Sequence, residues 1–429
     1  MNLLLRRKQP LLPSRRMRRV EILSPAGDME KLKVAIAFGA DAVYLSGKSF
    51  GLRAGSGNFT HDQMKEAVEY SHVRGVLCYV TMNILAHAQD IAVLDGEIQF
   101  CHETGVDALI VSDAGIFRRI RTLFPDFEIH ISTQASITNA DGCLFWYEQG
   151  ARRIVLAREL TLAEIADIRR QIPADLKLEC FVHGAMCMSY SGRCLLSNYF
   201  TGRNANHGEC AQPCRWKYSV TEEKRPDQPL IAEEDIRGTY LFNSRDICMI
   251  DHVPELVLAG IDSFKIEGRI KGSFYAATTT KAYREALDAY LESPDAYIPD
   301  PVWKLSLERT VHRVFGTGFY FDSPADNAQI FLDDTYLRSA FVAGMVVGYD
   351  KEKKLAVISQ RNKISEGDIL HVLMPDGHCE PIPVQGLLNE NGEPIQSTPH
   401  AQMLYYLPVK EELPAYSFLS RDGDKDRAK

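Results

Sequence analysis

The sequence predicts an α/β chain whose main part is a (β/α)8, TIM-like barrel and whose C-terminal part is a small all-β barrel domain. Two observations predict the first fold. Between residues 20 and about 290 short apolar runs alternate with longer amphipathic segments, and eight of these runs are strand candidates. A third observation predicts the second fold, because beyond residue 340 the pattern becomes short strands and turns. The chain of 429 residues, 45% of them hydrophobic, is long enough for two such domains.

The eight strand candidates are short apolar runs of strand length. They are residues 21–24, 42–46, 77–81, 108–112, 128–132, 153–157, 176–182 and 263–266. Four of them contain or follow the similar phrases G-A-D-A-V, G-V-D-A-L, G-A-R-R-I and G-I-D-S-F, in which a glycine ends a helix and the chain turns into a buried strand. Repeated βα units also build open doubly wound sheets. We favour closure because an eighth strand follows a long insertion.

Helix-like stretches lie between the strands, as the barrel requires. They include residues 28–38, 60–74, 95–104, 144–149 and 162–171. A connector at 291–339 with a helical piece near 303–314 follows the barrel. The C-terminal strands are expected at 341–349, 355–360, 368–374, 382–387 and 402–406, with Asp-Gly and Asn-Gly turn signals between them. The predicted domains are therefore a barrel at 20–290 with a cysteine-rich insertion at 184–240, and a β-barrel at 340–421.

Composition and charge narrow the class of protein. Residues 1–19 are basic and, like the tail at 422–429, are expected to be disordered. No apolar run approaches the roughly 20 residues of a transmembrane helix, and the N-terminal apolar pieces are too short for an export signal. The ten cysteines are then expected in a reducing compartment, so we expect a cytoplasmic protein without a membrane anchor. A net charge of −8 argues against a uniformly basic surface but leaves room for a local basic patch.

Four cysteines gather in the segment that follows the seventh strand. Cys187, Cys194, Cys210 and Cys214 lie in a loop rich in Gly, Ser and Asn, whereas the other six cysteines are scattered and are interpreted as small buried residues. Thiolates on loops suit an iron–sulfur cluster, and a structural zinc ion would take the same four ligands. The cluster gains weight because thiols that follow a barrel strand would lie at the catalytic mouth.

Polar side chains alternate with apolar ones near the ends of several strands. If the apolar parity faces the helices, the polar parity lines the barrel interior, where active sites lie at the carboxyl ends of the strands. The polar set includes Glu179, His183, Asn83, Gln134, Lys265 and Glu267. Glu179, His183 and Gln134 are the candidate catalytic residues. The alternative is a set of buried polar groups that satisfy one another, with Lys265 paired to Glu179 or Glu267.

The cysteine segment carries a family resemblance. The phrase E-C-F-V-H-G-A-M-C-M-S-Y-S-G-R-C-L-L-S at residues 179–197 resembles the signature of the peptidase U32, or collagenase-like, family. Further matching phrases are L-S-P-A-G-D, F-G-L-R-A, S-T-Q-A-S, V-L-A-R-E-L and F-K-I-E-G-R. Within the family the chain is most similar to the branch that helps make 5-hydroxyuridine at the wobble position of tRNA. The resemblance implies a [4Fe–4S] cluster on Cys187, Cys194, Cys210 and Cys214, and an oxygen-independent hydroxylation that depends on prephenate.

The resemblance also suggests which residues bind the substrates. A dicarboxylate such as prephenate needs paired cations, for which Arg53, Arg158, Lys265 and Arg269 are the candidates, with Asn83 and Glu267 beside them. Arg193 and Arg203 interleave with aromatic residues around the cysteines and are candidates for contacts to tRNA. For the aromatic residues we favour a loop folded over the cluster. A protein partner of the same family is a further expectation.

Two other functions stay open. The family label suggests a peptidase, but the chain has no H-E-x-x-H motif, so proteolysis is the second choice. Ser191, Gly192 and Ser197 are interpreted as residues that shape the cysteine loop. The third hypothesis is a zinc-stabilised RNA-binding or assembly protein without catalytic activity.

Overall fold

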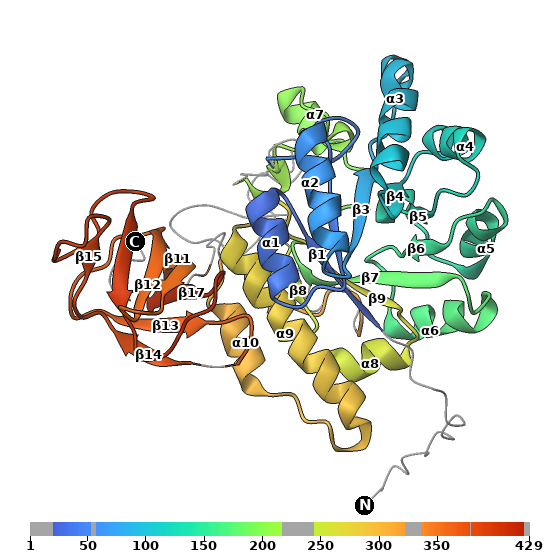
Figure 1. Cartoon of the computed structure of the whole chain (residues 1–429). Coiled ribbons are helices and arrows are strands. Elements are labelled where there is room, and N and C mark those ends of the chain that lie inside the picture. Colours follow the sequence, from blue (N-terminus) through green and yellow to red (C-terminus); the bar gives the residue numbers. More distant parts are fainter. Residues whose placement is uncertain are drawn as a thin grey trace, which may run out of the picture.

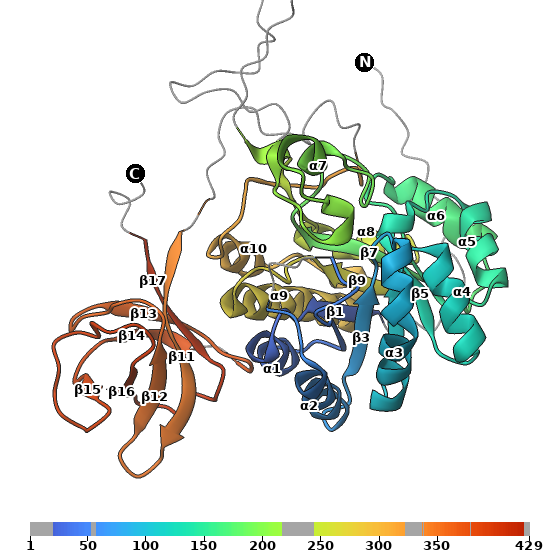
Figure 2. The same ribbon diagram turned by 90° about the horizontal axis from the view of Figure 1, so that it is seen from above.

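The structure is a computed structural model that describes residues 20–52, 57–216, 244–321, 337, 339–377 and 379–423. It consists of a barrel surrounded by helices and a separate β domain (Figure 1). Figure 2 shows that the β domain lies beside the barrel, next to helices α1 and α9.

Eight parallel strands close the barrel. They are β1 (Glu21–Pro25), β2 (Ala42–Leu45), β3 (Leu77–Met82), β4 (Ala108–Val111), β5 (Ile129–Ile131), β6 (Arg153–Val155), β7 (Lys177–Gly184) and β9 (Ser263–Ile266). Each strand pairs with the next, and β9 pairs in parallel with both β7 and β1. The predicted (β/α)8 barrel is therefore confirmed, and closure follows from the two partners of β9.

Helices cover the outside of the barrel. They are α1 (Met29–Ala37), α2 (His61–His72), α3 (Ala88–Thr104), α4 (Ala114–Leu123), α5 (Ala140–Glu148), α6 (Leu162–Gln171), α8 (Val253–Leu258) and α9 (Ser273–Glu292). Side-chain caps set several starts. Thr60 and Gln63 form a capping box on α2, and Asp113 accepts from two backbone amides of α4. Helix α3 begins before the predicted residue 95, because the Asp90 carboxylate accepts from the backbone amide of His87.

The insertion after β7 carries the four loop cysteines and a short helix, α7 (Leu196–Thr201). The chain then returns through β8 (Asp246–Cys248), which pairs antiparallel to β7 and parallel to β10 (Phe315–Gly316). Sequence patterns do not predict β8 and β10, because strands of three and two residues are too short to show a period. A buried ion pair between Asp246 and Arg313, 2.7 Å from Oδ1 to Nη2, ties this added sheet to the connector.

The C-terminal part is the predicted all-β domain. Its antiparallel strands are β11 (Ala340–Asp350), β12 (Leu355–Gln360), β13 (Ile369–Leu373), β14 (Cys379–Pro383), β15 (Leu388–Asn389), β16 (Leu404–Pro408) and β17 (Phe418–Asp422). Their order is β14-β13-β17-β11-β12-β16-β15. Strand β17 is absent from the sequence prediction although it lies between β11 and β13. Helix α10 (Pro301–Glu308) is the helical piece of the connector.

The β domain packs on the barrel through aromatic side chains. Phe418 of β17 contacts Phe38 and Phe274, which follow α1 and begin α9, with ring centroids 6.4 and 5.6 Å away. An ion pair between Arg361 and Glu30 lies at the same junction. In the described part of the chain, none of the helices combines the length and the apolar character needed to cross a bilayer.

Candidate functional site

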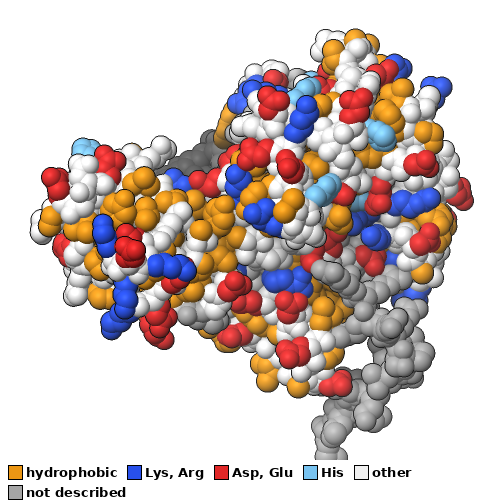
Figure 3. Space-filling model, viewed as in Figure 1, with side chains coloured by type: hydrophobic (Ala, Val, Ile, Leu, Met, Phe, Trp, Pro, Cys, Tyr) orange, Lys and Arg blue, Asp and Glu red, His pale blue; other side chains and the backbone are white. Residues whose placement is uncertain are grey.

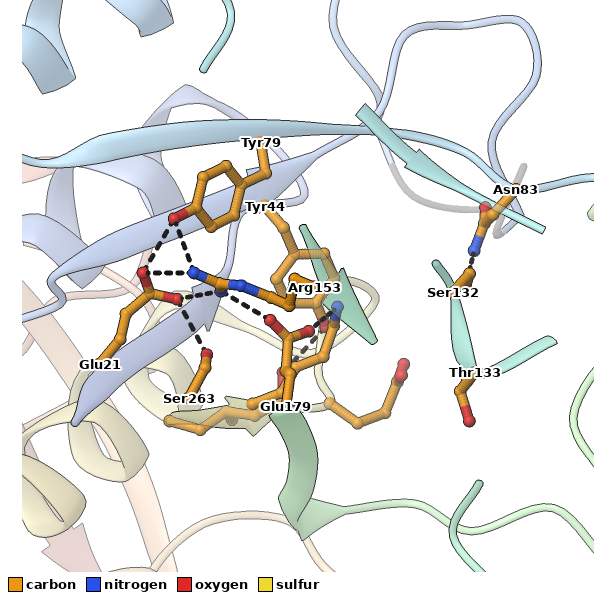
Figure 4. Close-up of polar contacts among 12 residues, drawn as sticks. Glu21, Tyr44, Tyr79, Asn83, Ser132, Thr133, Arg153, Glu179 and Ser263 are labelled. Carbon is orange, nitrogen blue, oxygen red and sulfur yellow. Dashed lines mark hydrogen bonds and ion pairs between the residues drawn. The ribbon is translucent and has the colours of Figure 1, made fainter. Parts of the chain in front are cut away.

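The barrel interior is filled by ion pairs (Figure 4). Arg153 of β6 donates to Glu179 of β7 at 2.8 Å and also to Glu21 of β1. The second oxygen of Glu179 accepts from Lys265 of β9 at 2.6 Å. Tyr79 donates to Glu21 at 2.8 Å and thereby adds β3 to the network. Charged groups thus join strands β1, β6, β7 and β9, and the Tyr79 hydroxyl joins β3 to them.

The network fixes the charge of its members. Burial alone would raise the pKa of Glu179, but the charges of Lys265 and Arg153 outweigh this effect and lower the pKa to about 2. Glu21 shows the same balance. Burial alone would raise the pKa of Glu21, but the charge of the Arg153 guanidinium outweighs this effect and lowers the pKa below its usual value. Glu179 is completely buried and both its oxygens are occupied. The carboxylate of Glu179 therefore holds Lys265 in place and has no oxygen directed at a substrate.

A cationic pocket lies above this network, at the carboxyl ends of the strands. Its cations are Lys265, Arg158 and Arg269, and its other lining residues include Tyr44, Thr81, Asn83, Ser132, Thr133, Gln134, Phe181 and Glu267. In Figure 4 Asn83, Ser132 and Thr133 lie to one side of the ion pairs. Asn83 Nδ2 donates to Gln134 Oε1 at 2.9 Å. Three cations beside several hydroxyl and amide groups suit a small molecule with carboxylates.

The space inside this cationic pocket is about 30 Å³, which is the room of a single water molecule. A larger ligand must therefore displace side chains. The Arg158 guanidinium lies in the wall of this pocket. It donates to the Ala185 carbonyl at 2.6 Å, lies 3.9 Å from Glu267 and stacks on the Phe181 ring, 4.2 Å from the ring centroid. Arg158 Nε is buried and makes no hydrogen bond within the described residues. A carboxylate would supply that missing acceptor.

A second cavity of about 430 Å³ lies next to the first and contains three of the loop cysteines. Its lining includes Cys187, Cys210 and Cys214 together with Arg203, Arg215, Lys271, Asp246 and Glu267. Glu267 lines both cavities, so the cationic pocket and the cysteine cavity share a wall just after β9. Burial raises the pKa of the Cys214 thiol, the Arg215 charge opposes this rise, and Cys187, Cys210 and Cys194 each add to it, so the other three cysteines lie near Cys214.

Four neighbouring thiols are the donor set of a [4Fe–4S] cluster or of a structural zinc ion. Across the described ranges, no three His, Cys, Asp or Glu side chains already meet in an arrangement that could hold a metal ion. Cys194 is not in the lining of the cavity, which contains the other three. In its chemistry the donor set fits a four-thiolate group, and the cavity gives such a group a place beside the cationic pocket.

Close backbone contacts hold the cysteine loop on the barrel. Gly184 ends β7 with a φ of +106°, and a Cβ atom there would lie 2.5 Å from the Glu267 carbonyl oxygen. Gly192 has a φ of +76°, and its Cβ would lie 2.8 Å from the side chain of Gln134. The hydroxyl of Ser197 accepts from the Ala211 amide at 3.0 Å, which joins two halves of the loop. The loop thus covers the barrel mouth at Gln134.

The predicted site residues divide into several groups. Six of them line the cationic pocket, namely Asn83, Gln134, Arg158, Lys265, Glu267 and Arg269. Arg203 lines the cysteine cavity, and Arg193 is exposed on the loop. Glu179 lies in the ion-pair network beneath the pocket. Arg53 lies outside the described residues. The interior parity is therefore correct for Asn83 and Gln134, but Glu179 supports the pocket from below and does not line it.

The structure places His183 away from both cavities. Its ring lies against Tyr275 and Tyr283 of α9 and against Phe315. The reason is an irregularity in β7, because the pairing with β9 shifts register between Phe181 and His183. Such a bulge turns the following side chain to the other face of the sheet. The alternation that places Glu179 inside the barrel therefore fails for His183, and the expectation that it lines the interior is wrong.

Other residues of the two cavities are missing from the sequence prediction. Lys271 and Asp246 of the cysteine cavity and Tyr44 and Thr133 of the cationic pocket belong to this group. Arg153, in the ion-pair network beneath the pocket, is missing as well. Arg153 is the first residue of a strand, and the polar parity of β6 carries the signal that it points inward. Asp246 and Lys271 give no such signal. Asp246 follows the insertion and Lys271 follows β9, and both reach the cavity only through tertiary packing.

Comparisons with known proteins give a consistent family. Residues 27–330 match the model of peptidase family U32, and residues 338–420 match that of the family's C-terminal domain. A tRNA hydroxylation protein of Bacillus subtilis is 35% identical over 89% of this chain and 89% of its own length. A 23S rRNA 5-hydroxycytidine synthase of Escherichia coli is 35% identical over 83% of this chain and 53% of its own length. A protein named collagenase from Porphyromonas gingivalis is 34% identical over 70% of this chain and 73% of its own length.

Proposed function

The chain belongs to peptidase family U32, and from this membership we propose that it is an RNA-modifying enzyme that hydroxylates the wobble uridine of tRNA to 5-hydroxyuridine. The observation that carries the proposal is the shared wall at Glu267, which places a cationic pocket next to a cavity with cysteine thiols. A relative of similar length whose name states tRNA hydroxylation, and a longer relative named for the synthesis of 5-hydroxycytidine in rRNA, support the same reaction class.

In this proposal Cys187, Cys194, Cys210 and Cys214 hold a [4Fe–4S] cluster. When bound, the cluster supplies redox chemistry that does not need molecular oxygen. The protein contributes the surroundings. Lys271 and Arg215 line the same cavity, and their positive charges favour an anionic thiolate-bound group over neutral thiols. Zinc in the same four-thiolate site is the competing assignment.

The cationic pocket is the proposed site of a dicarboxylate co-substrate, with prephenate as the hydroxyl donor. Arg158 and Arg269 would each bind a carboxylate, and Lys265 supplies the positive floor of the pocket while Glu179 keeps it in position. Asn83 and Gln134 orient the ligand through their amides. Because the pocket and the cysteine cavity meet at Glu267, the bound donor would lie beside the cavity of the loop cysteines.

The test is the analysis of tRNA nucleosides by mass spectrometry. The gene is deleted in a strain that lacks other uridine-hydroxylating genes, and the strain is then complemented without oxygen. We expect 5-hydroxyuridine-derived nucleosides to disappear on deletion and to return with the wild-type gene. The four single Cys→Ser variants should not restore them, whereas Cys379→Ser, which changes a cysteine of the β domain, should. Unchanged nucleosides in the deletion strain would overturn the proposal.

The peptidase remains the second candidate, because one relative carries the name collagenase. Iron and sulfide content and the visible spectrum of anaerobically purified protein separate the hypotheses. Iron and sulfide in equal amounts with a brown colour support the hydroxylase. A colourless protein with zinc supports an assembly or RNA-binding role. Cleavage of a collagen-like peptide that persists when all four loop cysteines are replaced by serine would support the peptidase.

A further inference from the structure

Four aromatic side chains are exposed on the cysteine loop, Tyr190 among them at 45%, and the other three lie together. Tyr199 is 83% exposed, Phe200 48% and Trp216 41%. Large aromatic side chains normally bury most of their surface, so three exposed rings in one short segment need a reason. The sequence predicts that these aromatic side chains fold over the metal site. Their exposure shows a different arrangement, in which the rings face outward.

The three rings form one continuous row. The ring centroids of Tyr199 and Phe200 are 5.4 Å apart and those of Phe200 and Trp216 are 6.2 Å apart. Tyr199 and Phe200 belong to α7, between Cys194 and Cys210, while Trp216 comes two residues after Cys214. We call this row the aromatic platform. Because α7 is joined to the rest of the loop by the Ser197 to Ala211 hydrogen bond, the aromatic platform is fixed beside the cysteine cavity.

The cysteine loop that carries the aromatic platform also carries positive side chains. Arg193 and Arg203 are exposed, and Arg203 also lines the cysteine cavity with Arg215 and Lys271. Over the face of the molecule in Figure 3 the blue and red side chains are interspersed, which agrees with the net charge of −8. The platform is therefore a local combination of rings and cations on an otherwise mixed surface. A duplex offers phosphates but no free base faces, whereas an unpaired loop offers both.

We propose that Tyr199, Phe200 and Trp216 stack on unpaired nucleotides of an RNA loop, next to the base that enters the cysteine cavity. This inference rests on the proposed function and adds how the RNA is recognised. Stacking accepts any base, because every base has an aromatic face. The aromatic platform would thus select a single-stranded loop by its shape, and Arg193 and Arg203 would contact the adjacent phosphates.

The experiment measures binding of an anticodon stem–loop RNA to the metal-loaded, full-length protein by fluorescence anisotropy. Tyr199→Ala and Trp216→Ala should each weaken binding about tenfold, which corresponds to ~1.4 kcal/mol. Tyr199→Phe keeps the ring and should bind like the wild type. Leu258→Ala is the matched control, because Leu258 is 76% exposed at the end of α8, at the opposite end of the barrel from α7 (Figure 1). A fully paired RNA of equal length should bind weakly to all variants.

The outcomes separate this inference from the proposed function. If the wild type modifies tRNA and both alanine variants bind the loop as tightly as Leu258→Ala does, the aromatic platform is wrong and the function stands. If the variants lose loop binding but tRNA from the deletion strain keeps its modification, the platform stands and the function fails. If the variants bind RNA normally but lose self-association or a protein partner, the surface binds protein and the inference is overturned.

Discussion

At the scale of single residues, Arg153 is the side chain on which the barrel interior depends. Its guanidinium contacts the carboxylates of both Glu21 and Glu179; Arg153 is 1% exposed and Glu179 is fully buried. A buried ion pair adds little net stability compared with apolar packing, but removing one partner leaves an unpaired charge. The pair of carboxylates therefore makes this arginine hard to replace.

Replacing Arg153 with methionine should lower the free energy of unfolding by about 3 to 5 kcal/mol, because Glu21 loses its counter-charge and Glu179 keeps only Lys265. Urea denaturation followed by circular dichroism measures the change. Adding Glu21→Gln to the variant removes that unpaired charge and should recover part of the loss. A single variant as stable as the wild type would show that the ion pair contributes no such energy.

His183 makes a second prediction, about pH. Burial lowers the pKa of His183 to about 3, so the folded protein keeps the ring neutral. The unfolded chain binds a proton below about pH 6.5, and the free energy of unfolding should then fall as the pH falls, by at most ~1.4 kcal/mol per pH unit, until the folded protein is also protonated near pH 3. His183→Phe fits the aromatic surroundings and removes this contribution.

The measurement for His183 is urea denaturation of both proteins at several pH values between 4 and 7. The difference in unfolding free energy between His183→Phe and the wild type should grow in favour of the variant as the pH falls. Other acid-sensitive groups, such as His130, cancel in that difference. Parallel pH profiles would contradict the buried neutral histidine.

The candidates His183 and Glu179 show how far the sequence alone can predict the position of a single residue. Alternation along a strand predicts correctly that Asn83, Gln134 and Lys265 reach the pocket. The same rule fails at His183, because a shift of register inside β7 follows from pairing with β9 and leaves no trace in the strand's own sequence. Glu179 lies inside the barrel, as predicted, but its ion pairs with Arg153 and Lys265 give it a structural role.

At the scale of elements, the cysteine loop should depend on one glycine more than on another. Gly192→Ala places a Cβ 2.8 Å from Gln134, while Gly202→Ala meets nothing within 4 Å, and both residues have a positive φ, +76° and +71°. In both variants the left-handed backbone conformation should lower the free energy of unfolding by about 1 kcal/mol. We expect only Gly192→Ala to expose the loop to proteases as well and, if the loop holds the proposed cluster, to lower the iron content. Equal effects would show that the contact with Gln134 is unimportant.

The elements that sequence reasoning finds are those with enough residues to show a period. The eight barrel strands and the amphipathic helices meet this condition. The short strands β8 and β10 do not, since their pairing with β7 and with each other is decided by the return of the chain after a long insertion. Strand β17 lies beside β11 and β13, but its sequence near the chain end resembles a polar tail.

At the scale of the whole molecule, the two domains should unfold together. Phe418 is 1% exposed between Phe38 and Phe274 of the barrel side, so Phe418→Ala should cost about 3 to 5 kcal/mol and split the thermal transition seen by calorimetry into two. Arg361→Ala, which breaks the partly exposed pair with Glu30, should cost less than about 1 kcal/mol and leave one transition. Equal effects of the two variants would contradict an apolar junction.

The fold class is the feature that the sequence predicts best at this scale. Eight strands in order and an all-β C-terminal domain follow from the pattern alone, whereas the position of the β domain against α1 and α9 depends on scattered side chains such as Phe38 and Phe418. No local pattern marks those residues as neighbours.

The ion pairs inside the barrel have one more consequence, for the accuracy of folding. Glu21, Arg153, Glu179 and Lys265 come from β1, β6, β7 and β9, and each must point inward to meet its partner. If one of these strands slipped by a single residue, its charged group would turn toward the apolar side of the helices without a counter-ion. A barrel interior made only of apolar side chains would tolerate such a shift of register more easily. The charged interior thus acts as a check on strand alignment, because only the correct register lets the ring of strands close with every charge matched.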